Sequence, residues 1–232
     1  MRFLFAIILL SSILPLSAQF SVQMPIGLSI GSPIGPIPEG STGVPGTRLW
    51  GGVMLEYRFA ERLAIRAGLS YASKASEYVA LVRGQQQAEA NVLGTVVRLP
   101  FQFDYEATVR GRFANRYLQL PLLLVWHNQS RFRPYGGPYL AYNIRPYHRG
   151  RVDVVVEGGL IEIRNQAFDE TAGLRSWDAG LMLGTDFSII GPLAISLQFQ
   201  YGLSPLYENN PEGLEGNFRN AYLQIGFYAR IE

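Results

Sequence analysis

The stretch that decides the fold is AYLQIGFYARI, residues 221–231, in which apolar side chains alternate with polar, small or tyrosine side chains. Leu223 and Ile225 fall on one face of this segment, and Gln224 and Tyr228 fall on the other. Successive side chains of a β-strand point to opposite faces, so a period of two predicts a strand. The segment therefore predicts a strand with one apolar face and one polar face.

Seven further segments show the same alternation: residues 24–30, 49–59, 63–71, 118–126, 134–144, 177–187 and 193–203. The connections between the eight segments alternate in length. Short connections are expected at residues 60–61, 128–132 and 190–192, and long ones at residues 31–46, 74–114, 147–176 and 204–218. This alternation is typical of outer-membrane barrels, which have short periplasmic turns and longer external loops. The sequence thus predicts an all-β fold, an eight-stranded antiparallel up-and-down transmembrane β-barrel with extended extracellular loops.

The first 18 residues have the pattern of a secretory signal peptide. A basic Arg2 precedes an apolar run over residues 3–10, and Leu16-Ser17-Ala18 provides a small-residue cleavage site. No later stretch is long and apolar enough to predict a membrane-spanning helix. We therefore expect a leader at residues 1–18 and one outer-membrane β-barrel domain at residues 19–232.

Aromatic residues on the apolar face gather near the ends of the predicted strands. Near the short turns lie Phe59, Trp126, Phe187 and Phe227, and near the long loops lie Tyr71, Tyr142, Trp177 and Tyr201. Aromatic rings prefer the headgroup level of a bilayer, so two girdles favour a membrane barrel in the cell outer membrane. A soluble periplasmic lipocalin-like barrel with an apolar ligand cavity remains as an alternative.

The polar face carries charged side chains, which the barrel would enclose. The predicted inward charges are Glu56, Arg58, Arg66, Asp178, Asp186 and Arg230. A tight turn at residues 60–61 places Glu56 nearly opposite Arg66, so these two should pair. Eight strands leave room mainly for side chains, which predicts a plug of ion pairs and tyrosines. A narrow pore or small-solute carrier that uses these charges is the alternative.

The long connections contain strand signals of their own. Residues 152–156 and 160–163 flank Glu157-Gly158-Gly159, which is a hairpin pattern. Residues 92–99 and 101–109 suggest strands that extend beyond the bilayer. Such loops could recognise a partner or simply cover the barrel mouth.

Composition excludes several kinds of chemistry. The chain has no cysteine, which excludes disulfides and thiol catalysis, and its net charge of +2 provides no polycation for nucleic acid. His127 and His148 are the only histidines, and the predicted strands place them at opposite ends of the barrel. His127 is expected at the headgroup interface. We therefore predict no catalytic residue, no metal site and no cofactor.

Four segments together resemble a known family. They are YLQLPLL at residues 117–123, YGGPY at residues 135–139, the spacing of Asp178 with Gly180 and Gly184, and the last strand at residues 221–231. These resemble the strands of the PorT-like outer-membrane β-barrel family of Gram-negative envelopes. The resemblance spans residues 20–232. It implies an integral outer-membrane barrel surrounded by lipid, without catalytic residues, and some members are tied to protein secretion.

The resulting functional expectation is a non-enzymatic outer-membrane protein. Its role would be structural, secretion-associated or partner-binding, with an envelope or secretion protein contacting the external loops, chiefly residues 74–114 and 147–176. The pore or carrier stays as the alternative.

Overall fold

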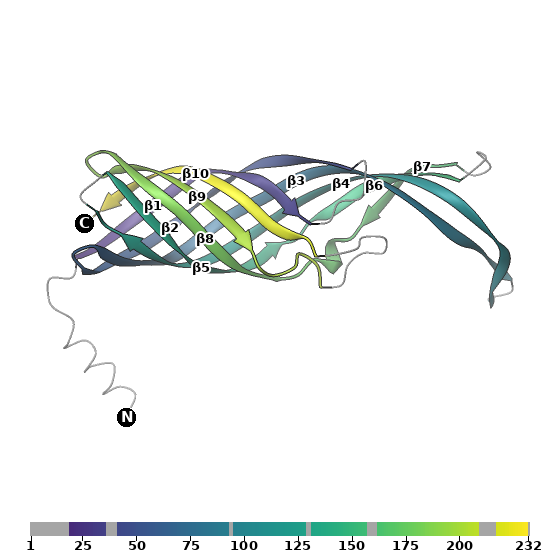
Figure 1. The fold of residues 1–232 in the computed structure, drawn as a ribbon, viewed down its shortest axis with the longest axis horizontal. Helices are drawn as coiled ribbons and strands as arrows, with labels where there is room; N and C mark the ends of the chain where they lie inside the picture. Colours follow the sequence, from purple (N-terminus) through teal and green to yellow (C-terminus); the bar gives the residue numbers. More distant parts are fainter. Residues whose placement is uncertain are drawn as a thin grey trace, which may run out of the picture.

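The computed structural model describes residues 19–35, 41–92, 95–128, 131–156, 162–208 and 217–231 (Figure 1). The strands are β1 (Gln19–Ile34), β2 (Thr42–Ala60), β3 (Leu63–Val92), β4 (Thr95–Trp126), β5 (Phe132–Arg145), β6 (His148–Val156), β7 (Glu162–Asp169), β8 (Trp177–Ile190), β9 (Leu193–Gly202) and β10 (Arg219–Ile231). A single 3-10 turn covers Thr171–Gly173. Within the described residues, no helix has the length and apolar character needed to cross a membrane. The predicted signal peptide lies outside these residues.

Eight of the strands pair in a ring. β1 pairs with β2 and with β10, and the pairing continues through β3, β4, β5, β8 and β9 back to β10, always antiparallel. The predicted all-β, antiparallel up-and-down architecture is confirmed. The β1–β10 register starts at Val22 opposite Ile231, so the first strand begins and the last strand ends at the same, short-turn end of the barrel (Figure 1).

The two remaining strands add to a part of the sheet that rises beyond the ring. β6 pairs with residues 105–113 of β4, and β7 pairs with β6. We call residues 76–92 of β3, residues 95–113 of β4, β6 and β7 the extension. It projects from the end of the barrel opposite the short turns (Figure 1).

The extension contains strands where the sequence analysis expected long loops. Residues 74–114 are not a loop, because β3 continues to Val92 and β4 begins at Thr95 in one long hairpin. The two strands expected at residues 92–99 and 101–109 are not separate, because β3 ends at Val92 and both expected segments fall on the single strand β4 from Thr95 onward. The hairpin expected within residues 147–176 is present as β6 and β7, although its turn lies outside the described residues. Likewise, β1 extends well beyond the expected residues 24–30.

The short connections lie close to the positions that the sequence predicts. β2 and β3 are joined at Glu61 and Arg62, and β8 and β9 at Gly191 and Pro192. Gly191 has a φ of +54°, a left-handed conformation that glycine adopts without the steric cost of a side chain. The turn expected at residues 128–132 lies partly outside the described residues.

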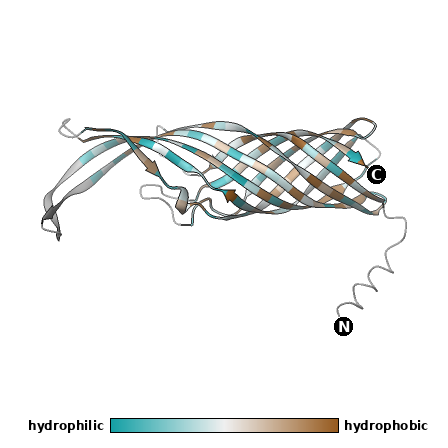
Figure 2. Cartoon of the chain, turned by 180° about the vertical axis from the view of Figure 1, so that it is seen from behind, coloured by the Kyte–Doolittle hydropathy of each residue, from teal (hydrophilic) through white to brown (hydrophobic). Residues whose placement is uncertain are grey.

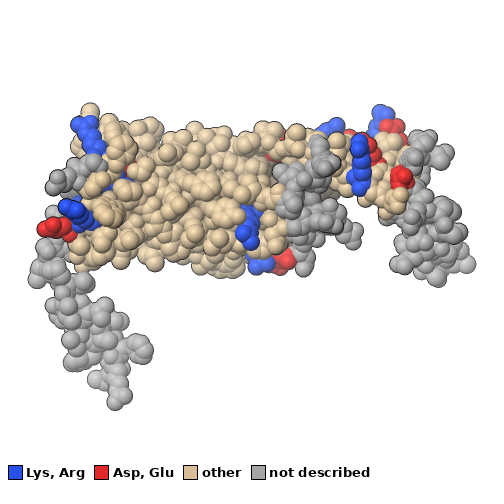
Figure 3. All heavy atoms as spheres, in the orientation of Figure 1, with Lys and Arg blue, Asp and Glu red and all other residues tan. Residues whose placement is uncertain are grey.

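The ring is apolar outside and polar inside. Leu55, Leu197 and Ile225 are 57%, 42% and 40% exposed, whereas Gln198 and Gln224 are buried. Figure 2 shows apolar residues concentrated along the ring and more polar strands in the extension. On the face shown in Figure 3, charged residues lie at the two ends of the barrel and on the extension, with an uncharged band between them. A soluble protein has apolar side chains inside and polar ones outside. The reverse arrangement seen here suits a barrel whose outer face meets lipid.

Candidate functional site

A cluster of buried charges lies inside the barrel near the short-turn end. Glu56 on β2 is directly opposite Arg66 on β3, and Arg66 Nη2 lies 2.8 Å from Glu56 Oε2. The same nitrogen lies 2.6 Å from Oδ2 of Asp186 on β8. These side chains are at most 5% exposed. One guanidinium therefore joins two carboxylates from different strands, which is how buried charges are tolerated.

Further polar groups surround the two carboxylates. His127 Nε2 lies 2.9 Å from Glu56 Oε1, and Tyr228 Oη donates to Asp186 Oδ2 at 2.9 Å. Arg133 approaches both carboxylates at 3.6 Å. The predicted headgroup position of His127 is wrong, because this side chain, directly after the end of β4, is only 8% exposed and contacts Glu56 inside the barrel.

A ladder of amides occupies the middle of the bore. Gln119 and Gln200 donate to each other's side-chain oxygens at 3.3 and 3.1 Å. Gln200 also donates to Gln224 at 3.2 Å, and Gln198 donates to the same Gln224 oxygen. These amides come from β4, β9 and β10, so they tie strands on different sides of the ring together.

A second ion pair lies nearer the extension. Lys74 Nζ lies 3.4 Å from Asp178 Oδ2 and 4.8, 5.4 and 5.3 Å from the ring centres of Tyr117, Tyr139 and Tyr222. The lysine is 1% exposed. The carboxylate and the three aromatic faces all attract a buried ammonium. The sequence analysis missed Lys74 because it placed this residue in a loop. In a continuous strand, Lys74 falls on the same inward face as Arg66.

The structure brings most of the predicted inward charges together. Four of the six are buried and two are half-buried: Glu56, Arg66, Asp178 and Asp186, and then Arg58 and Arg230. All except Asp178 lie at the short-turn cluster, where Arg58 Nη2 is 3.2 Å from His127 Nδ1 and Arg230 Nη2 is 3.9 Å from Glu56 Oε1. Among the described residues, no group of three or more ligand side chains could hold a metal ion. The arrangement is suited to filling the bore and holding the strands in register.

The predicted aromatic girdles lie on the outer face. Phe59, Trp126 and Phe227 near the short turns are exposed, as are Tyr142 and Trp177 near the extension. The other predicted members are half-exposed: Phe187, Tyr71 and Tyr201. The rings also contact one another, at 5.0 Å for Phe132 with Phe187 and 4.9 Å for Tyr142 with Trp177. Sequence reasoning missed Phe132, whose outward parity follows from its place in β5.

An apolar outer face, bounded by aromatic rings, around a polar interior is the arrangement of a membrane barrel. Residues 17–208 match the family model of the outer membrane protein beta-barrel domain. The chain belongs to this family. It is an outer-membrane β-barrel protein, and the predicted location in the cell outer membrane is confirmed.

Several solved outer-membrane barrels are similar to this one. Neisserial surface protein A (NspA) has 15% sequence identity and a TM-score of 0.36, with 92% of this chain and 98% of NspA covered. Ail of Yersinia pestis has 13% identity, a TM-score of 0.37, and coverage of 92% and 99%. OprG of Pseudomonas aeruginosa has 13% identity, a TM-score of 0.40, and coverage of 91% and 96%. No curated protein matches the sequence.

A second buried histidine connects the barrel to its extension. His148, at the start of β6, is 1% exposed, and its ring stacks on Phe113 with centroids 4.1 Å apart. Its Nε2 lies 2.7 Å from the Tyr78 hydroxyl, and its Nδ1 lies 2.8 Å from the Tyr207 hydroxyl. Burial lowers the pKa of His148 to about 4, against a smaller opposing effect of Asp169. The ring is therefore neutral at pH 7 and can donate to one tyrosine while accepting from the other.

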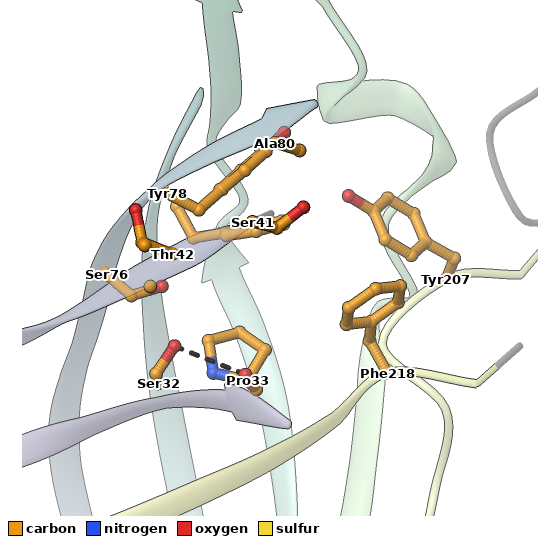
Figure 4. A pocket seen from close by; sticks show the side chains of 11 residues that line it. Ser32, Pro33, Ser41, Thr42, Ser76, Tyr78, Ala80, Tyr207 and Phe218 are labelled. Carbon is orange, nitrogen blue, oxygen red and sulfur yellow. Dashed lines mark hydrogen bonds between the residues drawn. The ribbon is translucent and has the colours of Figure 1, made fainter. Parts of the chain in front are cut away.

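A small cavity adjoins this histidine cluster. It has a volume of about 60 Å³, and its lining includes Tyr78, Phe113, Tyr207 and Phe218. Figure 4 shows Tyr207 and Phe218 on one side and Tyr78 and the β1–β2 residues on the other. Ligand pockets usually enclose about 300–1,000 Å³. This cavity is therefore better explained as a packing gap at the barrel mouth.

Proposed function

We propose that this protein is a non-enzymatic outer-membrane barrel whose extension contacts another envelope protein. The observation that carries the proposal is the length of two strands. β3 has 30 residues and β4 has 32, whereas β9, which is also a strand of the ring, has 10. Crossing a bilayer requires about 9–11 residues of a strand. Most of the extra length builds the extension and serves no purpose in the membrane.

The orientation of the barrel supports a partner outside the cell. Short turns of bacterial outer-membrane barrels face the periplasm, and the longer connections face outward. The extension lies at the end opposite the short turns (Figure 1). By this rule we expect it to project from the cell surface.

The extension has features that suit contact with a protein. β7 is an edge strand, and β2 pairs with β3 only as far as Val79. Free strand edges can add a strand from another chain. Val79, Val155 and Ile163 are exposed apolar side chains on this sheet, at 37%, 44% and 45%. The resemblance to PorT-like barrels supports a secretion or envelope protein as the class of partner.

The interior supports a structural barrel in preference to a carrier. Three buried layers occupy the bore, at Arg66, at the glutamine ladder and at Lys74. We therefore expect almost no conductance in planar bilayers. Stable channels whose conductance changes in Arg66→Gln would contradict the plugged barrel and favour the narrow pore.

Site-specific photo-crosslinking in cells tests the proposed partner. A photoreactive amino acid at Val155 or Ile163 should give adducts with a distinct protein, because both side chains lie exposed on the extension. The same group at lipid-facing Leu197 is the matched control and should give none. Absence of protein adducts at the two extension positions, or equal adducts at Leu197, would show that the extension is not the contact surface.

A further inference from the structure

A shallow groove with several arginines lies on the outside of the barrel where it meets the extension. Its volume is about 670 Å³. The basic side chains that line it are Arg48 from β2, Arg112 and Arg116 from β4, and Arg145 from β5. Leu28 and Leu49 also line it, and both are exposed apolar residues. The groove thus combines a lipid-like wall with concentrated positive charge.

These arginines have little acidic compensation. Arg112 lies 3.7 Å from Glu77, and both side chains are well exposed. Within the described part of the chain, no carboxylate lies within 4 Å of a charged nitrogen of Arg48, Arg116 or Arg145. Other basic residues of the extension have closer partners, such as Arg110 with Asp153 at 2.7 Å. The groove is therefore a site of unbalanced positive charge.

The strand register adds a second indication of a missing anion. Arg116 and Arg145 are direct cross-strand partners at an irregular point of the β4–β5 pairing. Like charges directly opposite each other in a sheet are destabilising. An anion between the two guanidinium groups would remove this repulsion.

The height of the groove identifies the source of the anion. Leu118 pairs with Tyr142, a member of the aromatic girdle, and beyond the buried Tyr117–Asn143 pair the Arg116–Arg145 pair follows toward the extension. Tyr71 of the same girdle also lines the groove. Aromatic girdles mark the level of the lipid headgroups. The arginines therefore lie where the phosphates of lipids gather.

We propose that this groove binds the phosphate-bearing headgroup of a lipid in the leaflet next to the extension. The planar fork of arginine matches phosphate oxygens and can donate two parallel hydrogen bonds to them. The acyl chains would lie against Leu28 and Leu49 below, while Arg116 and Arg145 hold the phosphate above.

Native mass spectrometry of the refolded full-length protein tests this site. The protein is prepared in a neutral detergent and titrated with diphosphoryl lipid A as the probe. We expect a bound lipid on the wild type and at least about a tenfold weaker affinity for the double variant Arg116→Gln/Arg145→Gln, because charge-assisted hydrogen bonds are lost. Arg116→Lys/Arg145→Lys keeps the charge without the fork and should bind with intermediate affinity.

Three comparisons make the result decisive. Arg83→Gln removes a 75% exposed arginine of β3 outside the groove and should bind lipid A like the wild type. Heat-modifiable gel migration verifies that each variant is folded. Millimolar inorganic phosphate should not displace the lipid. Equal affinity of the Gln double variant and the wild type would overturn the proposal, as would displacement by inorganic phosphate, which would indicate a site for soluble anions.

Discussion

The barrel and the extension share strands and backbone pairing but differ in how they treat charge. β3 carries Arg66 inside the barrel, where it is buried between two carboxylates, and Arg83 in the extension, where its pair with Glu106 at 3.0 Å is 75% and 51% exposed. The hydrogen-bonded hairpin of β3 and β4 runs through both regions. The difference teaches that the surroundings of each face, and not the strand itself, determine which side chains it needs.

The largest effect should come from removing a buried charge. Arg66→Met leaves Glu56 and Asp186 without the cation that joins them. We expect a loss of about 3–5 kcal/mol in the free energy of unfolding, the cost of leaving an uncompensated buried charge. Denaturant titration of the barrel in lipid vesicles, followed by tryptophan fluorescence, measures it.

Arg83→Ala is the matched change in the extension. Loss of an exposed ion pair should cost at most about 1 kcal/mol. If Arg66→Met and Arg83→Ala were equally mild, the buried cluster would have no special role in holding the barrel together.

The outer faces of the two regions should respond differently to a new charge. Leu197→Arg places a cation against the hydrocarbon and should cost about 2–4 kcal/mol of unfolding free energy. Val155→Arg introduces the same side chain at an equally exposed position of the extension, where water solvates it, and should stay within about 0.5 kcal/mol. The same vesicle titration compares them, and equal costs would contradict the assigned membrane boundary.

Acid should loosen the extension before the barrel. The pKa of His148 is about 4 in the folded protein, below its ordinary value of 6.5. A depressed histidine pKa means that its contribution to stability is complete above about pH 6.5 and is lost as the pH falls toward 4. At pH 5 the local stability around His148 should be lower by about 2 kcal/mol.

Hydrogen exchange of β6 amides, corrected for the intrinsic effect of pH, measures this change against β9 amides as an internal reference. The variant His148→Gln removes the titrating ring and should abolish the pH effect. Acid sensitivity that persisted in His148→Gln would assign the change to another group.

Sequence reasoning worked where lipid imposes a pattern on the chain. In β9 and β10 the outer face must be apolar and the inner face polar, so a period of two identifies the strands and their parity. Outside the membrane no lipid imposes this alternation: β7 is exposed at all but one position, whereas Phe113 and His148 of the same extension are buried. Residues 74–114 therefore looked like a loop, although their backbone forms a continuous hairpin.

Only the contact between two strands joined by a short turn could be predicted from the sequence. The pairing of Glu56 with Arg66 follows from a tight turn and the β2–β3 register. The approach of Asp186 and Arg133 depends on which strands face each other once the ring is formed, and a linear sequence does not contain that information. The inward direction of His127 could have been predicted, because the neighbouring Trp126 was expected to face lipid.

The most local comparison concerns single hydroxyl groups at the junction of the two regions. Tyr207→Phe removes the partner of His148 Nδ1, and Tyr78→Phe removes the partner of Nε2. A lost hydrogen bond costs about 1 kcal/mol, and up to about 3 kcal/mol where a buried donor is left without an acceptor. Because a neutral imidazole has one donor and one acceptor nitrogen, the two variants should lose different amounts of stability.

Hydrogen exchange measures this difference. Exchange of β6 amides should accelerate more in the variant that leaves the ring N–H without an acceptor, with β9 amides unchanged. The ratio of the two rates thereby identifies which nitrogen carries the hydrogen, whereas unchanged exchange in both variants would show that packing of Phe113 alone holds the junction.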